Sequence, residues 1–438
     1  MPNSLPCGGC LHYDVGIKDR TEADTMPHHT TGLIHHPYRP PGDFQAPQPG
    51  VFKASTVYFP TVADMRRREW KDKSAYTYGL HGTPTTYLLE ERLCSLEGGL
   101  QCLLVPSGLA ALALVALAVL KTGDEVLIPD NAYGPNKALA EGELRHFGIT
   151  HRYYDPMSPD DLSSQITERT RMVWLDAPGS VSMEFPDLPE MVRRSRDRGV
   201  LCALDNTWGA GLAFKPFDLL GDQGASNDSE QAPLSVDISA HALTKYPSGG
   251  GDVLMGSVIT RDAALHLKIK LCHMRLGLGV AANDAETVLR SLPSMDLRYK
   301  AHDQTARELA AWWQAQPQCA QLLHPAFEGA PGHAHWQALC EREPGQGLAA
   351  GLFSVMIDAR YNQAQVDAFC DGLKLFKIGY SWGGPVSLVV PYNIASMRQA
   401  WPGHLKPGTL VRFSTGLESA RDLILDLHQA MQAHLPMA

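Results

Sequence analysis

The sequence predicts an α/β protein that has a large domain with a mostly parallel sheet, followed by a smaller α+β domain at the carboxyl end. Two observations lead to this class. Between residues 102 and 205, short apolar runs of strand length alternate with segments of helical period, and repeated β-α-β units of this length form parallel sheets that are covered on both faces. A largely helical stretch then leads to a second alternation of strands and helices.

Composition restricts the functional class. The chain has 438 residues, of which 44% are hydrophobic, so it can form two or three core-containing units. The net charge is −9 with both signs interspersed, which argues against a nucleic-acid partner. Most of the nine cysteines stand in apolar runs, which is typical of reduced thiols, and the apolar run 109–120 is too short to span a bilayer. We therefore expect a soluble cytoplasmic protein that binds neither nucleic acid nor membrane.

Residues 1–80 are interpreted as an amino-terminal arm, before a large domain at 81–290 and a small domain at 291–438. Cys7 and Cys10, and the histidine pairs at 28–29 and 35–36, lack further ligand residues at fixed spacing. A flexible or subunit-contacting segment is therefore favoured over a metal site. Residues 65–73 predict a charged helix, and residues 76–83 predict a loop whose aromatics and glycines suit a site lining.

The first strand and the helix after it predict an anion site. Residues 86–97 have leucines at helical spacing and end at two glycines, and residues 102–105 form a short apolar strand. Pro106-Ser-Gly-Leu-Ala-Ala111 then opens a long apolar helix. Backbone N–H groups at such a helix start can bind a phosphate, which Gly108 would allow to approach closely. A buried helix with a small residue at its start would give the same pattern, so both interpretations stay open.

Strands and helices alternate from here to Asp205. The expected strands are residues 125–129, 150–154, 172–176 and 200–205, and the expected helices are 137–147, 159–166 and 188–198. Tyr133 follows the strand at 125–129, at the carboxyl edge where open α/β sheets bind ligands. Its flat ring could stack on a cofactor ring, or it could be a loop aromatic that caps the core.

Lys245 and Asp205 have complementary chemistry. Lys245 comes near the end of a half-apolar run, 239–246, before a glycine-rich loop, and a lysine desolvated there can lose its proton and condense with an aldehyde. Asp205 ends an apolar strand, where a carboxylate can pair with a pyridinium nitrogen. Together they suggest pyridoxal phosphate as a cofactor. The alternative for Lys245 alone is a solvated lysine at a strand end.

The rest of the chain completes the two domains. Residues 221–234 are polar and acidic without period, so we expect an exposed loop insertion there. Residues 253–260 predict a strand and 261–314 are largely helical; in the small domain we expect strands at 348–357 and 409–413 and helices at 363–373 and 417–434. Arg412 lies in the last strand, where it either binds a carboxylate with its guanidinium fork or takes part in an internal ion pair.

Four motifs, in this order, resemble those of the Cys/Met-metabolism family of pyridoxal-phosphate enzymes. They are Asp176-Ala-Pro-Gly-Ser-Val-Ser-Met-Glu184, Asp205-Asn-Thr-Trp208, Leu243-Thr-Lys-Tyr246 and Tyr380-Ser-Trp-Gly-Gly384. The resemblance covers residues 51–438 and is strongest to bacterial members that cleave cystathionine by β-elimination. A nicotinamide dehydrogenase is not indicated, because Pro106-Ser-Gly-Leu-Ala-Ala111 lacks the glycine spacing of a dinucleotide site.

The resemblance implies roles for individual residues. In the expected catalytic set, Lys245 forms the Schiff base with pyridoxal phosphate, Asp205 binds the pyridinium and Tyr133 stacks on the ring. The phosphate is expected at Ser107, Gly108, Leu109 and the hydroxyl of Thr244, the substrate carboxylate at Arg412, and the remainder of the substrate beside Ser381 and Trp382.

Tyr78 matches a tyrosine that a neighbouring subunit donates to the cofactor and the substrate. Two positions later the family usually has an arginine that binds the phosphate, and this chain has Leu80. The departure removes one charge from the expected phosphate site, and His81 or another arm residue could substitute for it.

The resemblance further implies fold type I, the aspartate-aminotransferase-like architecture, and a homotetramer made of two dimers that share active sites. The implied reaction is β-elimination from the sulfur amino acid L-cystathionine, which gives homocysteine, pyruvate and ammonia in methionine biosynthesis. γ-Lyases, γ-synthases and desulfhydrases use the same residue set, so they stay open as alternatives. A non-catalytic regulator or scaffold that binds the cofactor is an alternative of another class. We expect no metal.

Overall fold

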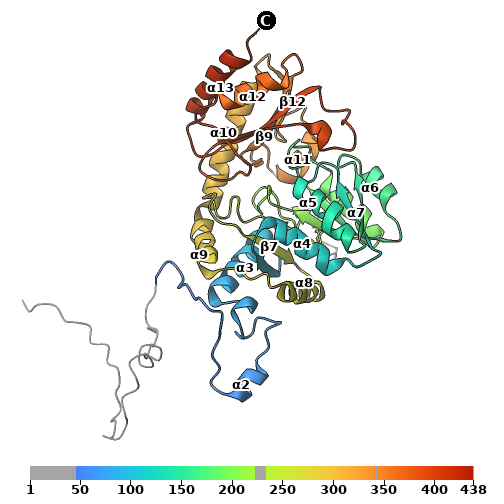
Figure 1. Cartoon of the computed structure of the whole chain (residues 1–438), viewed down its shortest axis with the longest axis vertical. Coiled ribbons are helices and arrows are strands. Elements are labelled where there is room, and N and C mark those ends of the chain that lie inside the picture. The colour runs from blue at the N-terminus through green and yellow to red at the C-terminus, as the bar shows by residue number, and fades with distance from the viewer. Residues whose placement is uncertain (1–45, 222–232, 342, 438) are drawn as a thin grey trace, which may run out of the picture. The chain divides into compact units, whose positions relative to one another are not determined.

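The computed structural model describes residues 46–221, 233–341 and 343–437. Pro49–Ala438 form one compact unit, which contains two β-sheets (Figure 1). Cys7, Cys10 and the two histidine pairs lie outside the described residues, as does most of the loop expected at 221–234. Among the described residues, no helix is both long and apolar enough to cross a bilayer.

The larger sheet has seven strands in the order β1-β7-β6-β5-β4-β2-β3. They are β1 (Gln101–Val105), β2 (Glu125–Pro129), β3 (Thr150–Tyr154), β4 (Thr170–Asp176), β5 (Leu201–Asp205), β6 (Ile238–His241) and β7 (Gly256–Thr260). From β6 through β5, β4 and β2 to β3 all pairs are parallel, whereas β7 is antiparallel to both β1 and β6. The predicted mostly parallel sheet is confirmed.

Both faces of this sheet are buried, because neighbouring residues of one strand belong to different hydrophobic clusters. On β4, Met172 and Trp174 pack in one cluster, and Val173 and Leu175 pack in the other. Burial on both sides explains why the strands are continuous apolar runs in the sequence. The helices of this region are α3 (Pro84–Glu97), α4 (Gly108–Val119), α5 (Gly134–Leu139), α6 (Pro159–Gln165), α7 (Leu188–Asp197), α8 (Ala263–Leu276), α9 (Ala282–Ser291) and α10 (Met295–Gln314).

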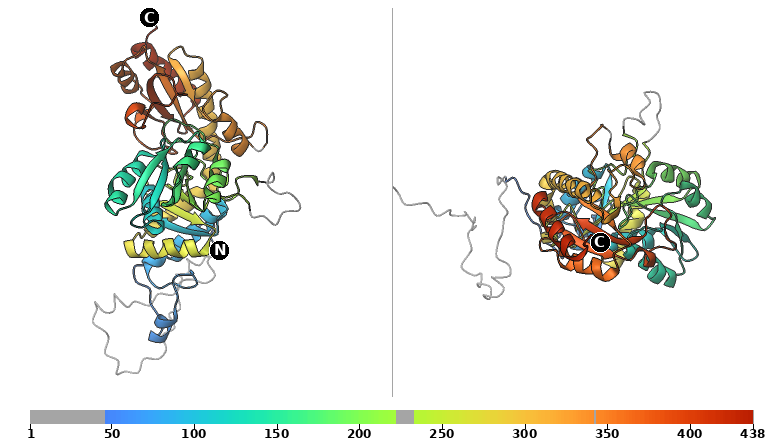
Figure 2. Two further views of the ribbon diagram at one scale, coloured as in Figure 1. Left: turned by 90° about the vertical axis from the view of Figure 1, so that its right-hand side faces the viewer. Right: turned by 90° about the horizontal axis from the view of Figure 1, so that it is seen from above.

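A second sheet has five strands in the order β10-β11-β12-β9-β8 and carries the carboxyl-terminal helices (Figure 1 and Figure 2). Its elements are β8 (Cys319–Leu323), α11 (His333–Cys340), β9 (Leu352–Asp358), α12 (Gln363–Asp371), β10 (Lys377–Ile378), β11 (Leu388–Tyr392), β12 (Gly408–Ser414) and α13 (Ala420–His434). Trp313, Phe353 and Phe413 belong to a hydrophobic cluster of its own. The smaller α+β region is therefore confirmed, and the expected domain boundary at residue 290 falls near the end of α9.

Two expected helices have other bounds. The helix expected at 65–73 is α2 (Val62–Arg67), because Thr61 caps its start by accepting a hydrogen bond from the Asp64 N–H at 3.0 Å. The helix expected at 137–147 starts earlier, as α5, and continues as the π-helical segment Ala140–Leu144.

Two expected strands are shorter than predicted, and some elements were not predicted. The strand expected to lead up to Lys245 ends at His241, so Lys245 lies in the turn that follows β6. The strand expected from residue 348 starts at Leu352, after a turn in which Ala350 has a φ of 58°. No counterpart of β8, β10, β11 or α11 is among the expected elements.

An ion-pair network joins the loop between β11 and β12 to the larger sheet. Arg398 donates to Asp130 at 3.1 Å and to Glu184 at 2.9 Å, and His404 lies 2.6 Å from Glu184. The Arg398 side chain is 5% exposed and that of Glu184 is fully buried. Burial raises the pKa of Glu184, but His404, Arg398 and a hydrogen bond from Ser182 together lower it to about 2. The network therefore holds the two sheets together through buried charge.

Arg398→Met should destabilise the protein by about 3–5 kcal/mol, because it removes the buried cation that Asp130 and Glu184 share and leaves them with Lys137 and His404 alone. Urea-induced unfolding at pH 7 measures this loss. Arg360→Met is the matched control, since it removes an ion pair with Asp358 whose arginine is 51% exposed, and it should change stability far less. Equal effects of the two substitutions would contradict the role given to Arg398.

The stability of the unaltered protein should also fall as the pH drops from about 4.5 to about 2. Glu184 has a folded pKa of about 2, below its ordinary value of 4.5, so its contribution is complete above pH 4.5 and is lost as the pH approaches the folded value. Urea midpoints measured across this range check the sign. They should fall less steeply in Glu184→Gln.

Candidate active site

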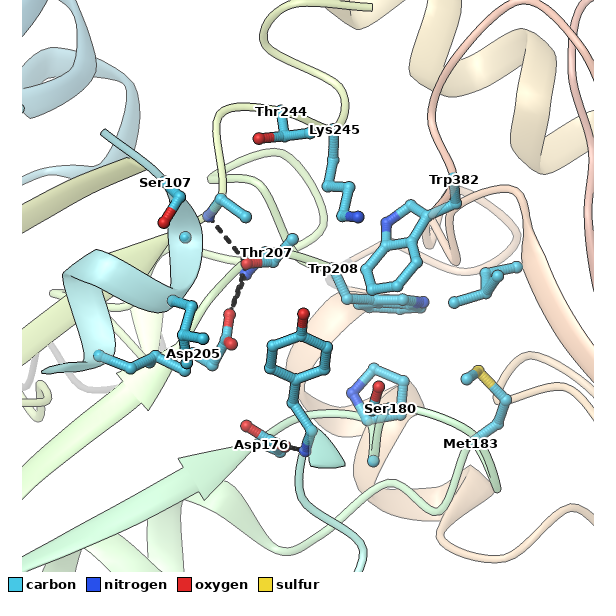
Figure 3. Close-up of a pocket in the computed structure, with 18 of the residues that line it drawn as sticks. Ser107, Asp176, Ser180, Met183, Asp205, Thr207, Trp208, Thr244, Lys245 and Trp382 are labelled. Carbon is cyan, nitrogen blue, oxygen red and sulfur yellow. Dashed lines mark hydrogen bonds between the residues drawn. The ribbon is translucent and has the colours of Figure 1, made fainter. Parts of the chain in front are cut away.

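The predicted site residues other than Tyr78 meet at the carboxyl ends of the parallel strands, where the second sheet approaches (Figure 3). A cavity of about 180 Å³, called here the inner cavity, is lined by Ser107, Gly108, Leu109, Tyr133, Asp205, Thr244, Lys245 and Trp382, among others. A wider space of about 820 Å³, called here the outer hollow, shares several of these residues and adds Ser381 and Arg412. Of the predicted site residues, Tyr78 lines neither.

The amine of Lys245 lies where the inner cavity and the outer hollow meet. Its Nζ donates a hydrogen bond to Ser381 Oγ at 2.6 Å and lies 4.4 Å from the centre of the Trp382 ring. Burial and, secondly, the positive charge of Arg412 lower the pKa of Lys245 to about 8, whereas Asp205 opposes the shift. Part of the amine is therefore neutral near physiological pH and can act as a base or a nucleophile.

Asp205 ends β5 and is held by Thr207. Its Oδ1 accepts hydrogen bonds from the Thr207 N–H at 3.0 Å and from the Thr207 hydroxyl at 2.5 Å. Burial raises the pKa of Asp205, although these hydrogen bonds and the nearby His241 and Lys245 act in the other direction. No ion pair among the described residues involves Asp205. Its carboxylate is thus available for a cationic ligand group, which would stabilise its ionised form.

A fully buried carboxylate holds the ends of β5 and β6 together. Glu97, the last residue of α3, accepts hydrogen bonds from Ser239 at 2.5 Å and from Asn206 at 3.2 Å, and lies 2.7 Å from His241 Nδ1. Ser239 and His241 belong to β6, and Asn206 directly follows Asp205. Because three polar partners offset the cost of burying Glu97, this cluster fixes the backbone that carries Asp205 and leads to Lys245.

The start of α4 faces the inner cavity, in agreement with the predicted anion site. Ser107 caps the helix by accepting a hydrogen bond from the Ala110 N–H at 3.0 Å. Gly108 packs so closely that a Cβ there would lie 2.5 Å from Ala242 Cβ. The Thr244 hydroxyl lies 3.3 Å from the carbonyl oxygen of Met255. The first N–H groups of a helix lack partners within it, and together with the helix dipole they favour an anion at this place.

Arg412 is buried in β12 without an acidic partner. It donates to the Ser180 carbonyl oxygen at 3.1 Å, and its guanidinium carbon lies 5.3 Å from the centre of the Trp382 ring and 5.2 Å from that of Tyr392. The residue is 5% exposed, and no ion pair among the described residues involves it. The internal ion pair that was the alternative for Arg412 is thus not found among the described residues. A buried arginine that lacks a carboxylate is suited to bind one from a ligand.

Sequence reasoning missed Asp176 as a site residue. It ends β4 directly beside Asp205 in the strand register, and its Oδ2 accepts a hydrogen bond from the Tyr133 N–H at 3.0 Å. Burial and the neighbouring Asp205 raise the pKa of Asp176 well above its ordinary value. Its place at the end of an apolar strand was the same signal that pointed to Asp205. Thr207 and Trp208, which also line the inner cavity, were missed as well.

Tyr78 lies apart from the inner cavity and the outer hollow of its own chain. It forms an isolated β-bridge with Thr56 and is 47% exposed. His81 stacks on Trp70, with the ring centres 4.3 Å apart, and like Leu80 it lines another, smaller cavity. A contribution of these residues to a neighbouring subunit therefore stays a prediction.

The family model for Cys/Met metabolism PLP-dependent enzymes matches residues 30–432. The chain belongs to this family. The structure has the expected fold-type-I architecture, and PLP, pyridoxal 5'-phosphate, is the cofactor on which the family depends.

Relatives within the family have different printed activities. A cystathionine beta-lyase of Bordetella avium is 35% identical over 93% of this chain and 99% of its own length. An L-alanine/L-glutamate racemase of Wolbachia pipientis wMel is 31% identical over 89% of this chain and 93% of its own. The crystal structure of a cystathionine gamma synthase from Xanthomonas oryzae pv. oryzae, in complex with aminoacrylate and cysteine, has a TM-score of 0.76 and 28% identity, and the match covers 91% of this chain and 96% of that one.

The residues of the site fit pyridoxal phosphate. Lys245 offers a partly neutral amine for the aldehyde, and the start of α4 offers N–H groups for the phosphate. Asp205 has a second oxygen, which accepts no hydrogen bond from the described residues and suits the ring nitrogen. All three line the same inner cavity. Arg412 is left for a second anion, the carboxylate of an amino acid.

The Lys245 amine of the cofactor-free protein should be modified by acetic anhydride with a midpoint near pH 8 rather than near 10.5, because only the neutral amine reacts. Mass spectrometry of the peptide that contains Lys245 measures the rate at each pH. Arg412→Met should raise the midpoint, since it removes a positive charge, and Asp205→Asn should lower it. A midpoint above pH 10 in the unaltered protein would contradict the desolvation of Lys245.

Proposed function

We propose that this chain is a carbon–sulfur β-lyase that converts L-cystathionine to homocysteine, pyruvate and ammonia, a reaction of methionine biosynthesis. The observation that carries the proposal is the Lys245 amine, with a pKa of about 8, in a site where Asp205 and Arg412 offer opposite charges. Asp205 suits a cofactor cation and Arg412 suits a substrate carboxylate. The relative from Bordetella avium, matched along nearly its whole length, supports the choice of reaction.

Pyridoxal phosphate, when bound, supplies an electron sink that stabilises negative charge at the Cα of an amino acid. We assign Lys245 to its aldehyde, Asp205 to its ring nitrogen and Tyr133 to the face of its ring. The phosphate is assigned to the start of α4 and to a neighbouring hydroxyl, that is, to Ser107, Gly108, Leu109 and Thr244. Asp176 accepts a hydrogen bond from the Tyr133 N–H and so positions the start of α5, which places Tyr133 at the cavity.

Lys245 moves the protons of the proposed reaction. With its amine free, it removes the Cα proton of the substrate and delivers a proton to the departing sulfur. Ser381, which accepts a hydrogen bond from this amine, keeps it directed into the site. Arg412 binds the α-carboxylate and Trp382 packs beside it, so the Cα–H bond is turned toward Lys245.

A γ-lyase or γ-synthase is the second candidate. γ-Elimination requires a further proton to be moved at Cβ, and the residues around the site suit either reaction. The fold match to the cystathionine gamma synthase favours this candidate. We prefer β-elimination because the Ser381-Trp382 loop and the Pro178-Gly-Ser180 segment resemble those of β-lyases, and because the Bordetella avium relative carries that name.

We further propose a cytoplasmic homotetramer of two dimers, in which Tyr78 reaches the site of a neighbouring subunit. The residues before α3 support contact with another chain, because Phe52, Tyr58 and Val62 are 53%, 90% and 58% exposed. Six described cysteines are free thiols, as in a reducing compartment: Cys94, Cys102, Cys202, Cys272, Cys319 and Cys370.

Given L-cystathionine, the protein loaded with pyridoxal phosphate should release pyruvate and homocysteine in equal amounts. Mass spectrometry of the 2-oxo acid and of the thiol measures the products. Lys245→Ala is the control, because it removes the proton carrier and should abolish turnover while far-ultraviolet circular dichroism stays unchanged. A predominance of 2-oxobutyrate and cysteine would favour the γ-lyase instead.

Arg412→Met should raise the KM for cystathionine about ten- to hundredfold, which corresponds to the loss of a charge-assisted hydrogen bond worth about 1.5–3 kcal/mol. The affinity for pyridoxal phosphate should change little, because Arg412 lies outside the inner cavity. Steady-state kinetics and absorbance titration with the cofactor separate the two effects. If cofactor affinity fell more than substrate affinity, Arg412 would not be the carboxylate site.

A further inference from the structure

A buried acid–base pair lies behind the inner cavity and takes no part in the reaction proposed above. Glu97 is the last residue of α3 and His241 is the last residue of β6, and Glu97 Oε1 lies 2.7 Å from His241 Nδ1. Both side chains are 0% exposed. Their own chain therefore encloses the pair completely, and a neighbouring subunit cannot contact it.

The surroundings of Glu97 favour its ionised form. Its Oε2 accepts hydrogen bonds from the Ser239 hydroxyl at 2.5 Å and from the Asn206 amide at 3.2 Å. Its Oε1 faces a ring nitrogen of His241, which can donate as well. A carboxylate with donors at both oxygens is stabilised relative to the protonated acid.

His241 is the only basic residue within ion-pair distance of Glu97 in the described part of the chain. The amine of Lys215 donates instead to the carbonyl oxygens of residues 96 and 211. Because a carboxylate buried without a cation is costly, we expect His241 to be an imidazolium. Its second N–H would lie at Nε2, which is buried without a partner, as is the Ser257 hydroxyl. Ser257 lies opposite His241 in the register of β6 and β7 and can accept this N–H directly or through a water.

Asp205 needs a lasting positive charge nearby. It lies beside Asp176 in the register of β4 and β5, and two carboxylates at one place repel each other. Burial raises the pKa of Asp205, whereas the hydrogen bonds from Thr207 and then the charges of His241 and Lys245 lower it. Lys245 is assigned to the aldehyde of the cofactor, so it cannot remain a free ammonium. Of these two charges, that of His241 is the lasting one.

We infer that Glu97 and His241 are positioning residues that hold a permanent positive charge beside Asp205 and so keep it ionised for the protonated ring nitrogen of pyridoxal phosphate. The route is short, because Asp205 is paired in register with Ala240, and His241 follows directly. Neither Glu97 nor His241 lines the inner cavity, so both act through Asp205. The inference rests on the proposed function only in the assignment of Asp205 to the ring nitrogen, and it holds for β- and γ-elimination alike.

Two substitutions remove the charges of the pair with little change of shape. Glu97→Gln removes the negative charge, and Asn206 Oδ1, which has no partner, can turn to accept from the new amide. Without that charge a buried imidazolium is unfavourable, so His241 should become neutral. His241→Asn removes the positive charge directly and keeps an N–H donor close to the place of Nδ1. Ser239→Ala is the matched control, since it removes a hydrogen bond to Glu97 and no charge.

The test compares pyridoxal phosphate with its analogue in which a C–H group replaces the ring nitrogen. Each protein is loaded with one of the two, and the dissociation constant is obtained from the absorbance retained after dialysis to equilibrium. The ratio of the two constants reports on the ring nitrogen alone, because all other contacts are shared. The preference for pyridoxal phosphate should fall about threefold to tenfold in Glu97→Gln and in His241→Asn, and it should stay the same in Ser239→Ala.

A spectroscopic measurement gives a second readout. In enzyme loaded with pyridoxal phosphate that carries ¹⁵N in its ring, the ¹⁵N chemical shift should indicate a protonated nitrogen in the unaltered protein. It should move toward the unprotonated value in Glu97→Gln and His241→Asn. A merely structural role of the pair would weaken the binding of both cofactors equally and leave this shift in place, and that result would overturn the inference.

Asp205→Asn separates the inference from the proposed function, because it should abolish the preference for the ring nitrogen. If it did not, the assignment of Asp205 would be wrong and the inference would fail with it. If it did, but the preference stayed unchanged or rose in Glu97→Gln and His241→Asn, Asp205 would be ionised without help and the inference alone would be overturned. Far-ultraviolet circular dichroism checks the folding of each variant, and either charge variant that folds decides the question.

Discussion

The removal of water from one amine, that of Lys245, is the constraint on which the site depends. An ammonium group in this place loses most of its hydration, and the hydrogen bond to Ser381 and the face of Trp382 replace it only in part. Arg412 makes the surroundings still less favourable for a positive charge, and Asp205 alone opposes this. Neither sheet creates these surroundings by itself, since Ser381, Trp382 and Arg412 come from the carboxyl-terminal half and Lys245 from the turn after β6.

Much of this arrangement was predictable because parallel strands end at a common edge. Asp205 and Tyr133 follow apolar runs, and the start of α4 follows another, so topology alone places them together. Lys245 was found for a partly wrong reason, because β6 ends at His241 and the lysine belongs to the next turn. The prediction succeeded all the same, since that turn leaves from the same edge.

What the sequence did not reveal depends on contacts between distant segments. The sequence could not show whether Arg412 forms an ion pair, because its neighbours Ser180, Trp382 and Tyr392 come from other segments of the chain. The apolar residues of β8 and β11 were visible in the sequence, but nothing in these runs shows that they pair with β9 and β12. For Asp176, the position at the end of a strand was visible in the sequence. Its raised pKa was not visible, because it follows from burial beside Asp205.

The loop fastened by Arg398 gives the outer hollow a fixed width. Swinging the second sheet away would pull Arg398 and His404 from Glu184 and Asp130 and leave buried charges unpaired, at a cost of several kcal/mol. Molecules that reach Lys245 therefore pass through an outer hollow of constant width, and a thiol formed beside Lys245 leaves by the same route. The width of the outer hollow then restricts the girth of the group on sulfur that can reach the amine.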